Sequence, residues 1–204
     1  MLLSKIVRKS PTLKLKSITR LTLEKKLIPI LKKLKPGIVL DMGSLNSPYK
    51  KFIPSTRYLT LDINKKNNPD ICCDIHNIKW QPNYFDTIIA TEVLEHLKDP
   101  KKAVSELYKI TKKGGVCIAT TRFIYPYHPG PKDYYRFTED SLKDIFSDFS
   151  SVKIIQHGNR LHALWQLLNY GRIEILFNIF NKLISLINFK DRKFCLGYII
   201  YAKK

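Results

Sequence analysis

The chain has 204 residues, of which 44% are apolar, and a formal net charge of +19 at pH 7. This length and apolar content predict one domain with a substantial core and an appendage. The four cysteines (Cys72, Cys73, Cys117 and Cys195) form no C-x-x-C pair, so their spacing indicates neither a disulfide framework nor a zinc site. A reducing cytoplasm is the expected compartment.

The positive charge is concentrated at the N-terminus, where residues 1–36 contain eleven Lys or Arg and a single acid, Glu24. Residues 1–35 are therefore predicted to form a basic helical arm. It could bind phosphates or an anionic membrane surface, but a solvated helix before the first strand is slightly favoured. Charges interrupt both the N-terminal apolar stretches and the stretch 161–189, so we expect neither a secretory signal nor a membrane span, and at most a peripheral membrane contact.

Taken in chain order, apolar spacing predicts a helix over 21–35 that stops at Pro36-Gly37. Short β-branched runs predict strands at 38–41, 58–62, 71–74 and 85–91. A helix over 100–111, capped by Asp99, should end at 112–115 and lead to a strand over 116–121. The remainder is predicted as a strand over 151–156, a largely helical insertion over 161–189 and a closing strand over 195–201.

Alternation of strands and helices predicts an α/β fold with a mostly parallel, doubly wound sheet. Such sheets bind ligands at the carboxyl ends of their strands, where Asp41, Asp62, Asp74 and Glu92 should converge. The predicted strand 38–41 ends at Asp41, just before Met42-Gly43, a pattern typical of a parallel strand that leads into a tight turn. Asp62 follows about 20 residues later, at the spacing of a carboxylate that binds ribose hydroxyls. These observations predict a cofactor that contains a nucleoside.

Over residues 36 to about 146, the chain resembles the class I S-adenosylmethionine-dependent methyltransferases, closest to the type 11 group. The resemblance is carried by residues 39–44, Leu61-Asp62, Asp74-Ile75, 85–97 with its Val-Leu-Glu-His, and 107–115 with its Lys-Lys-Gly-Gly. It implies a Rossmann-like sheet of seven strands, the last antiparallel, within a methyltransferase domain over 36–204. It also implies S-adenosylmethionine as the cofactor.

The resemblance further implies the residues around that cofactor. Asp41, Gly43 and Ser44 would form the turn around its methionine part. Asp62 would bind the ribose hydroxyls, and the adjacent Ile63 would be a further cofactor-binding residue. Asp74 and Ile75 would border the adenine, and Thr91 and Glu92 would close the pocket beside the sulfonium. Leu45 stands where the family usually has a second glycine, so its side chain must point away from the cofactor.

Two histidines are candidate catalytic groups on the acceptor side. If residues 91–97 form a helical turn, His96 would share a face with Glu92 and act as a general base, although packing at a helix start explains it as well. Glu92, Glu95 and His96, with His128, also resemble the ligands of metal-dependent RNA 2′-O-methyltransferases. We weigh this metal site as the less favoured alternative, because the same residues occur in metal-free family members.

The segment 125–138 is rich in proline, aromatic and charged side chains, and resembles a His-Pro…Asp-Tyr-Tyr-Arg-Phe-Thr segment of methyltransferases associated with surface glycans. Tyr127, His128, Tyr134, Tyr135 and Arg136 are the predicted acceptor-binding residues, with a purely structural loop as the alternative. The predicted acceptor is a small molecule or a glycan- or lipid-linked compound, methylated at oxygen. The apolar insertion 161–189 would pack on the domain, form a homodimer surface or meet a lipid-linked acceptor.

Two other functions stay open at this stage. An RNA methyltransferase is favoured by the charge of +19, but no appended RNA-binding module is recognisable, so a nucleic-acid partner is the less favoured reading. The second is a non-catalytic cofactor-binding module, which Leu45 in place of the family's second glycine makes conceivable. The acids of the predicted pocket and the many aromatic and charged side chains of the segment 125–138 argue against it.

Overall fold

The computed structural model describes residues 16–43, 45–168, 180–191 and 193–204. Its strands are β1 (Ile38–Met42), β2 (Arg57–Asp62), β3 (Ile71–Cys72), β4 (Phe85–Thr91), β5 (Thr111–Arg122), β6 (Ser151–His157) and β7 (Gly197–Lys203). Its helices are α2 (Ile18–Lys32), α3 (Pro100–Ile110), α4 (Glu139–Ile145), α5 (Arg160–Leu168) and α7 (Asn181–Ile184), with 3-10 turns at Lys50–Phe52, Lys65–Asn67, Ile75–Asn77 and Leu94–His96.

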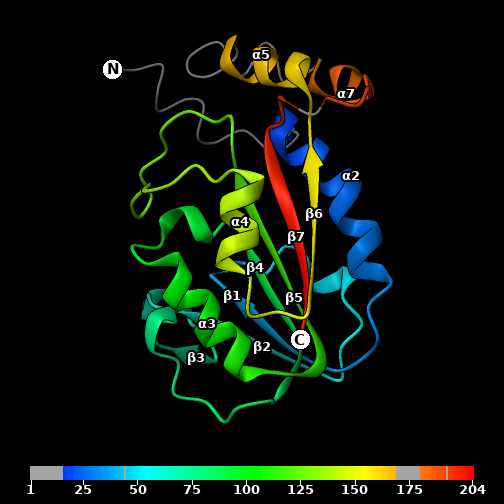
Figure 1. The fold of residues 1–204 in the computed structure, drawn as a ribbon. Coiled ribbons are helices and arrows are strands. Elements are labelled where there is room, and N and C mark those ends of the chain that lie inside the picture. Colours follow the sequence, from blue (N-terminus) through cyan, green and yellow to red (C-terminus); the bar gives the residue numbers. More distant parts are fainter. Residues whose placement is uncertain (1–15, 44, 169–179, 192) are drawn as a thin grey trace.

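The strands form one sheet in the order β3-β2-β1-β4-β5-β7-β6 (Figure 1). β1 to β5 pair in parallel, whereas β7 runs antiparallel to both β5 and β6. The predicted seven-stranded, mostly parallel sheet with an antiparallel last strand is confirmed. Because chain order reverses between β1 and β4, the switch point that binds ligands in such sheets lies at the centre of this one.

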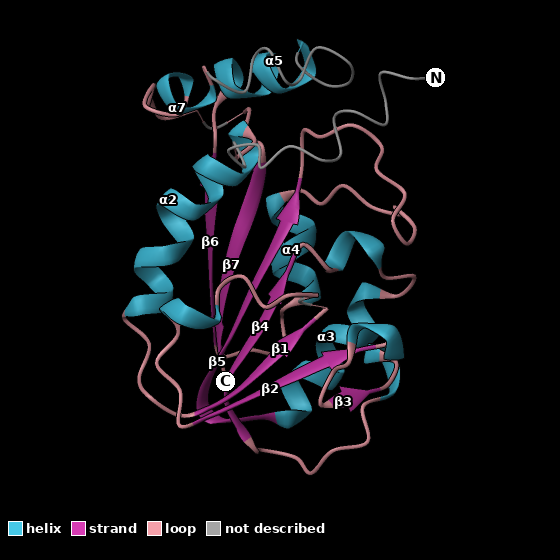
Figure 2. Cartoon of the chain, turned by 180° about the vertical axis from the view of Figure 1, so that it is seen from behind, coloured by secondary structure: helices cyan, strands magenta, loops and turns pink. Residues whose placement is uncertain are grey.

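Helices cover both faces of the sheet, as the two opposite views show (Figures 1 and 2). Successive strand residues point to opposite faces, so Ile88 packs in the core under α3 and α4 while Ile89 packs under α2. Leu27 and Leu31 of α2 are fully buried against that second face. Residues 18–32 therefore form one layer of the domain.

Several predicted boundaries differ from the structure. β3 is only Ile71–Cys72, because Asp74 caps a 3-10 turn instead of extending the strand. β5 begins at Thr111, so residues 112–115, predicted as the end of a helix, lie in the strand. A register shift between Phe85 and Thr87 of β4 accompanies this extension. The structure also contains α4, a helix that the sequence analysis does not predict and that begins with a capping box between Thr138 and Ser141.

The helical insertion is described in part. α5 and α7 lie together at one end of the molecule, beyond β6, and both contact α2 (Figure 1). The other predicted helical residues of 169–179 lie outside the described residues, as do residues 1–15 of the basic arm. Among the described helices, none combines the length and the apolar character that a membrane span requires.

Candidate active site

The turn after β1 is built around Asp41 and Gly43. The Asp41 side chain is buried, and its Oδ2 accepts a hydrogen bond of 2.5 Å from the Tyr58 hydroxyl. Gly43 has a φ of +60°, and a Cβ there would lie 2.9 Å from Cγ2 of Val93. The turn therefore requires glycine for both its backbone angle and its space. The third predicted residue of this turn, Ser44, lies outside the described residues.

Leu45 occupies the place of the family's second glycine and has a φ of +50°. Its side chain is 68% exposed. The backbone thus keeps a left-handed conformation that glycine adopts more easily, while the side chain points into solvent. That this side chain points away from the cofactor stays a prediction.

Asp62 ends β2, and two neighbouring groups orient its carboxylate. Oδ1 accepts from the Asn64 amide and Oδ2 from the Asn67 side-chain amide, each at 2.8 Å. Since a carboxylate oxygen has two lone pairs, each oxygen can accept one further hydrogen bond. The adjacent Ile63 is exposed.

Asp74 follows β3 and caps the next turn. Its Oδ1 accepts from the His76 amide at 2.9 Å and lies 2.6 Å from His76 Nδ1. These hydrogen bonds hold the pKa of the Asp74 carboxyl below its usual value. Ile75 is buried in the core, which anchors the turn. Asp41, Asp62 and Asp74 thus lie at or just after the carboxyl ends of adjacent strands, at the same edge of the sheet.

The segment after β4 differs from the prediction. Thr91 is the last residue of the strand, and Glu92 has a φ of +55°. Only Leu94–His96 forms a 3-10 turn, so the expected helical turn that places Glu92 and His96 on one face is wrong. The Glu92 amide instead bonds the Thr120 carbonyl of β5 at 3.0 Å. Pairing with β5 therefore holds residue 92 out of a helix.

The side chain of Glu92 is directed to β5. It accepts hydrogen bonds from Thr120 Oγ1 at 2.8 Å and Arg122 Nε at 2.5 Å. Glu95 lies beside this pair, fully buried, and its Oε2 accepts from Thr121 Oγ1 at 2.9 Å. Burial, with the charge of Glu92 adding to it, raises the pKa of the Glu95 carboxyl above its usual value.

The loop after β5 brings the two predicted catalytic histidines together. The rings of His96 and His128 have centroids 4.9 Å apart. Nδ1 of His96 lies 2.5 Å from the Lys132 carbonyl oxygen, and Nδ1 of His128 lies 3.2 Å from Oδ2 of Asp133. Burial lowers the pKa of His128, with the positive charge of Arg122 adding to the effect. An imidazole kept neutral has a lone pair for chemistry.

The same loop is fixed by a bidentate ion pair. Arg136 donates from both terminal nitrogens to Asp133, at 2.5 and 2.6 Å, and also to the Pro126 carbonyl at 3.1 Å. The hydrogen bonds from Arg136 hold the pKa of Asp133 well below its usual range. The amide of Tyr134 bonds the Glu95 carbonyl at 2.8 Å, which docks the loop onto the segment after β4. Arg136, predicted to bind the acceptor, therefore has a structural role in the loop.

The three predicted tyrosines differ in their surroundings. Tyr127 is well exposed, while Tyr134 and Tyr135 are about 40% exposed. Tyr135 stacks on Phe137 and donates from its hydroxyl to the Lys98 carbonyl at 3.1 Å. The loop thus combines a fixed backbone with aromatic side chains that remain accessible.

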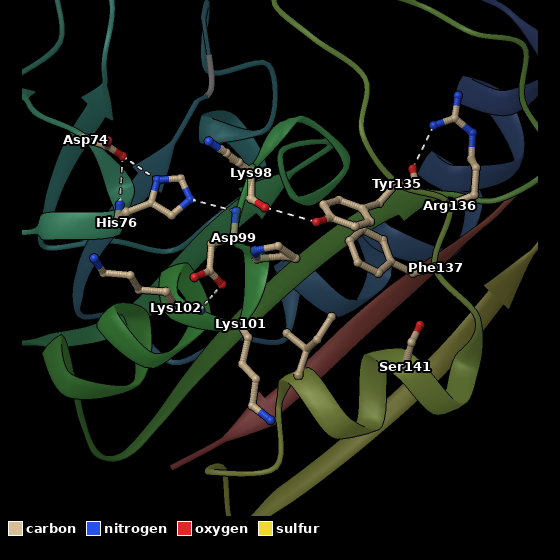
Figure 3. A pocket seen from close by; sticks show the side chains of 12 residues that line it. Asp74, His76, Lys98, Asp99, Lys101, Lys102, Tyr135, Arg136, Phe137 and Ser141 are labelled. Carbon is tan, nitrogen blue, oxygen red and sulfur yellow. Dashed lines mark hydrogen bonds and ion pairs between the residues drawn. The ribbon is translucent and has the colours of Figure 1, made fainter.

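A cavity of about 920 Å³ lies next to this loop (Figure 3). It is lined by residues from the turn after β3, the start of α3, the loop 135–137 and α4: Asp74, His76, Lys98, Asp99, Pro100, Lys101, Lys102, Tyr135, Arg136, Phe137, Ser141 and Ile145. It therefore joins one predicted cofactor residue, Asp74, to two predicted acceptor residues. The chain of hydrogen bonds from Asp74 through His76 to the amide of Asp99 forms one wall (Figure 3).

Sequence reasoning missed the three lysines of this cavity, Lys98, Lys101 and Lys102. Their clustering around the start of α3 was the available signal, because a helix N-terminus and ammonium groups both favour anions.

The sequence also offered Glu92, Glu95, His96 and His128 as one group of metal ligands, and the structure brings three of these four side chains together. Glu95, His96 and His128 each offer a ligand atom within 4.8 Å of the others, and Glu92 is not part of that group.

Comparisons with known proteins show what this chain is similar to. A family model described as a methyltransferase domain matches residues 49–119. In fold, the chain is similar to a SAM dependent methyltransferase from Archaeoglobus fulgidus, with a TM-score of 0.59 and 19% identity, covering 100% of this chain and 98% of that chain. A second SAM dependent methyltransferase, from Aquifex aeolicus, has a TM-score of 0.55 and 14% identity, covering 98% of this chain and 97% of that chain.

A third similar structure is phosphoethanolamine N-methyltransferase 2 from Haemonchus contortus, in complex with phosphomonomethylethanolamine and S-adenosylhomocysteine. It has a TM-score of 0.54 and 14% identity, and the match covers 91% of this chain and 51% of that chain. No curated protein matches the chain by sequence. At these identities the structural similarities establish the fold.

Proposed function

We propose that this chain, which carries a methyltransferase domain and has the fold of S-adenosylmethionine-dependent methyltransferases, transfers a methyl group from S-adenosylmethionine to an acceptor oxygen. The acceptor is a small molecule or a glycan- or lipid-linked compound. The observation that carries the proposal is the placement of Asp41, Asp62 and Asp74 at or just after the ends of the adjacent strands β1, β2 and β3. Asp74 also lines the cavity that the acceptor loop borders.

The residues present fit this cofactor. Gly43 gives the turn after β1 its φ of +60°, and Val93 packs against it where a Cβ would lie, so the glycine fixes the path of the backbone beside the proposed cofactor. Asp62 has two oriented oxygens, each able to accept a hydroxyl of the ribose. When bound, the cofactor supplies a methyl group on a positively charged sulfur, which leaves as a neutral thioether.

The protein's own contribution is alignment and exclusion of water, because the leaving group is already activated. The turn at Gly43 and the Asp62 carboxylate would fix the donor, and the loop 125–138 would cover the acceptor. His96 and His128 lie on the acceptor side. Nδ1 of His96 faces the Lys132 carbonyl oxygen, and Nδ1 of His128 faces the Asp133 carboxylate. With Nδ1 as the donor, Nε2 of a neutral imidazole has a lone pair that can take a proton or bind a cation.

The basic side chains that line the cavity outnumber the acidic ones, which favours an acceptor with an anionic group. The basic residues are Lys98, Lys101, Lys102 and Arg136, and the acids are Asp74 and Asp99. Ammonium groups attract phosphate and carboxylate groups without fixing their geometry. An acceptor that carries a phosphate or carboxylate near its reactive hydroxyl would therefore fit.

The test is calorimetric titration of S-adenosylmethionine and S-adenosylhomocysteine into the protein and into an Asp62→Ala variant. We expect micromolar binding in the wild-type protein and a loss of roughly 100-fold in the variant, the equivalent of about 3 kcal/mol from two charge-assisted hydrogen bonds. Asp70→Ala is the matched control, because Asp70 bonds Thr60 on the same strand and is not a predicted cofactor residue. Absence of binding to the wild-type protein would refute the proposal.

The charge of +19 supports a second candidate, an RNA acceptor. A gel-shift assay at low and high salt distinguishes the two. RNA binding that persists at high salt, with methyl incorporation into RNA, would favour the second candidate. Methyl incorporation into small acceptors with RNA binding confined to low salt would favour the first.

A further inference from the structure

Three metal-binding side chains converge on the acceptor side of the sheet. Glu95 and His96 belong to the turn after β4, and His128 belongs to the loop after β5. One potential ligand atom of each lies within 4.8 Å of those of the other two. Around a metal with bonds of about 2.1 Å, ligand atoms lie roughly 3–3.5 Å apart. Small side-chain rotations would close the group to that size.

Each imidazole is oriented by a protein oxygen that accepts a hydrogen bond from its Nδ1. The Lys132 carbonyl can only accept, so Nδ1 of His96 is the donor in their 2.5 Å contact and Nε2 carries the lone pair. The Asp133 carboxylate plays the same part for His128 at 3.2 Å, and Arg136 holds that carboxylate in place. A carbonyl or carboxylate behind the histidine is the usual arrangement around a metal-bound imidazole.

Two polar atoms of the group are buried and lack hydrogen-bond partners among the described residues. They are Nε2 of His128 and Oε1 of Glu95. The Glu95 side chain is 0% exposed, and its Oε1 lies 3.8 Å from Arg122 Nε. Buried polar atoms without partners are rare and costly, and a bound cation would satisfy both.

The local charge also admits a cation. Arg122 is neutralised by Glu92 at 2.5 Å, and Arg136 by Asp133 at 2.5 Å. Glu95 therefore remains as the uncompensated acid when it is ionised. One carboxylate and two imidazoles match the ligands that divalent transition metals bind, with positions left open for other ligands.

We propose that Glu95, His96 and His128 form a binding site for one divalent transition-metal ion of the manganese-to-zinc row. The two histidines then act as metal ligands on the acceptor side. An open coordination position would receive the acceptor oxygen and polarise its hydroxyl group. This use of the ion rests on the proposed function, whereas the binding of the ion does not.

The test uses the untagged full-length protein, stripped of metal with EDTA and titrated with CoCl₂ under an absorption spectrometer and with ZnCl₂ in a calorimeter. We expect one equivalent to bind, with visible cobalt bands typical of nitrogen and oxygen ligands. His96→Ala and Glu95→Gln should each weaken binding by at least the roughly 10- to 100-fold that loss of a supporting partner costs. His76→Ala is the matched control, since His76 lies outside the group, and should bind as the wild-type protein does.

Two outcomes would overturn the proposal. One is no stoichiometric binding to the wild-type protein; the other is wild-type affinity in both variants, with folding verified by circular dichroism. Cobalt bands from thiolate ligands would assign the ion to the accessible pair Cys72 and Cys73 and would also overturn it. The stripped protein is titrated in parallel with S-adenosylhomocysteine, so that loss of cofactor binding and loss of metal binding are recorded separately.

Discussion

The turn after β1 offers a sharp test of how the backbone shapes the cofactor site. Gly43 has a φ of +60°, where an L-residue costs about 1–2 kcal/mol. The added Cβ of Gly43→Ala would also lie 2.9 Å from Cγ2 of half-buried Val93, and relieving that overlap costs about 1 kcal/mol more. We therefore expect the free energy of unfolding to fall by about 2–3 kcal/mol.

The two contributions can be separated by a pair of further variants. Gly114 has a φ of +77°, and a Cβ there meets no atom within 4 Å, so Gly114→Ala should cost only the backbone contribution. Combining Gly43→Ala with Val93→Ala removes the overlap, and the double variant should be about 1 kcal/mol more stable than the sum of the single effects. Urea denaturation of Gly43→Ala, Gly114→Ala, Val93→Ala alone and the double variant measures these differences.

The same variants test the link to function. Gly43→Ala should bind S-adenosylhomocysteine at least tenfold more weakly, because the turn must shift to make room for the Cβ. Gly114→Ala should bind it as the wild-type protein does. If Gly43→Ala costs less than about 0.5 kcal/mol and leaves the affinity unchanged, this reasoning about the turn is refuted.

Three further predictions follow from individual side chains. Leu45→Gly removes the cost of a φ of +50° but adds conformational freedom to the unfolded chain, so the free energy of unfolding should change by less than about 0.5 kcal/mol. A tenfold loss of S-adenosylhomocysteine affinity would contradict the outward placement of the Leu45 side chain. Arg136→Lys loses the bidentate pair with Asp133, and limited proteolysis within 125–135 should become several-fold faster; equal rates would show that other contacts hold the loop. Burial lowers the pKa of His157 to about 4, against about 6.5 when unfolded, so the unfolded state binds more protons between these values. Stability should therefore fall by about 2.5 kcal/mol between pH 7 and 4.5 in urea denaturation, and by less in His157→Gln; equal losses would assign the effect to other groups.

The cofactor half of the molecule was predictable because its signals are local. A buried β-branched run such as Phe85–Thr91 specifies a strand by itself, and the acids stand at the strand ends whatever the rest of the chain does. The resemblance to class I methyltransferases, and the fold that it implies, are confirmed. The roles of the single site residues stay predictions, which the variants above test.

The errors come from contacts that no local pattern records. Residues 91–97 were expected to be helical, but pairing of Glu92 with Thr120, 28 residues away, keeps it at a φ of +55°. The strand β5 includes Lys112 to Gly115, where the Gly114 amide donates to the Lys204 carbonyl at 2.9 Å and the Lys204 amide donates to the Gly115 carbonyl at 3.0 Å. In both places, backbone hydrogen bonds to residues far away in the sequence override the tendency of the segment itself.

The acceptor half depends on long-range polar contacts, and this has a consequence for function. His128 reaches His96 only because the loop is docked by the Tyr134 amide on the Glu95 carbonyl and braced by Arg136 on Asp133. None of these contacts belongs to the sheet. Substitutions in the loop can therefore change the acceptor, or remove the proposed metal ligand, while the fold and the cofactor turn persist. This separation is why metal binding, cofactor binding and stability must be measured on the same variants.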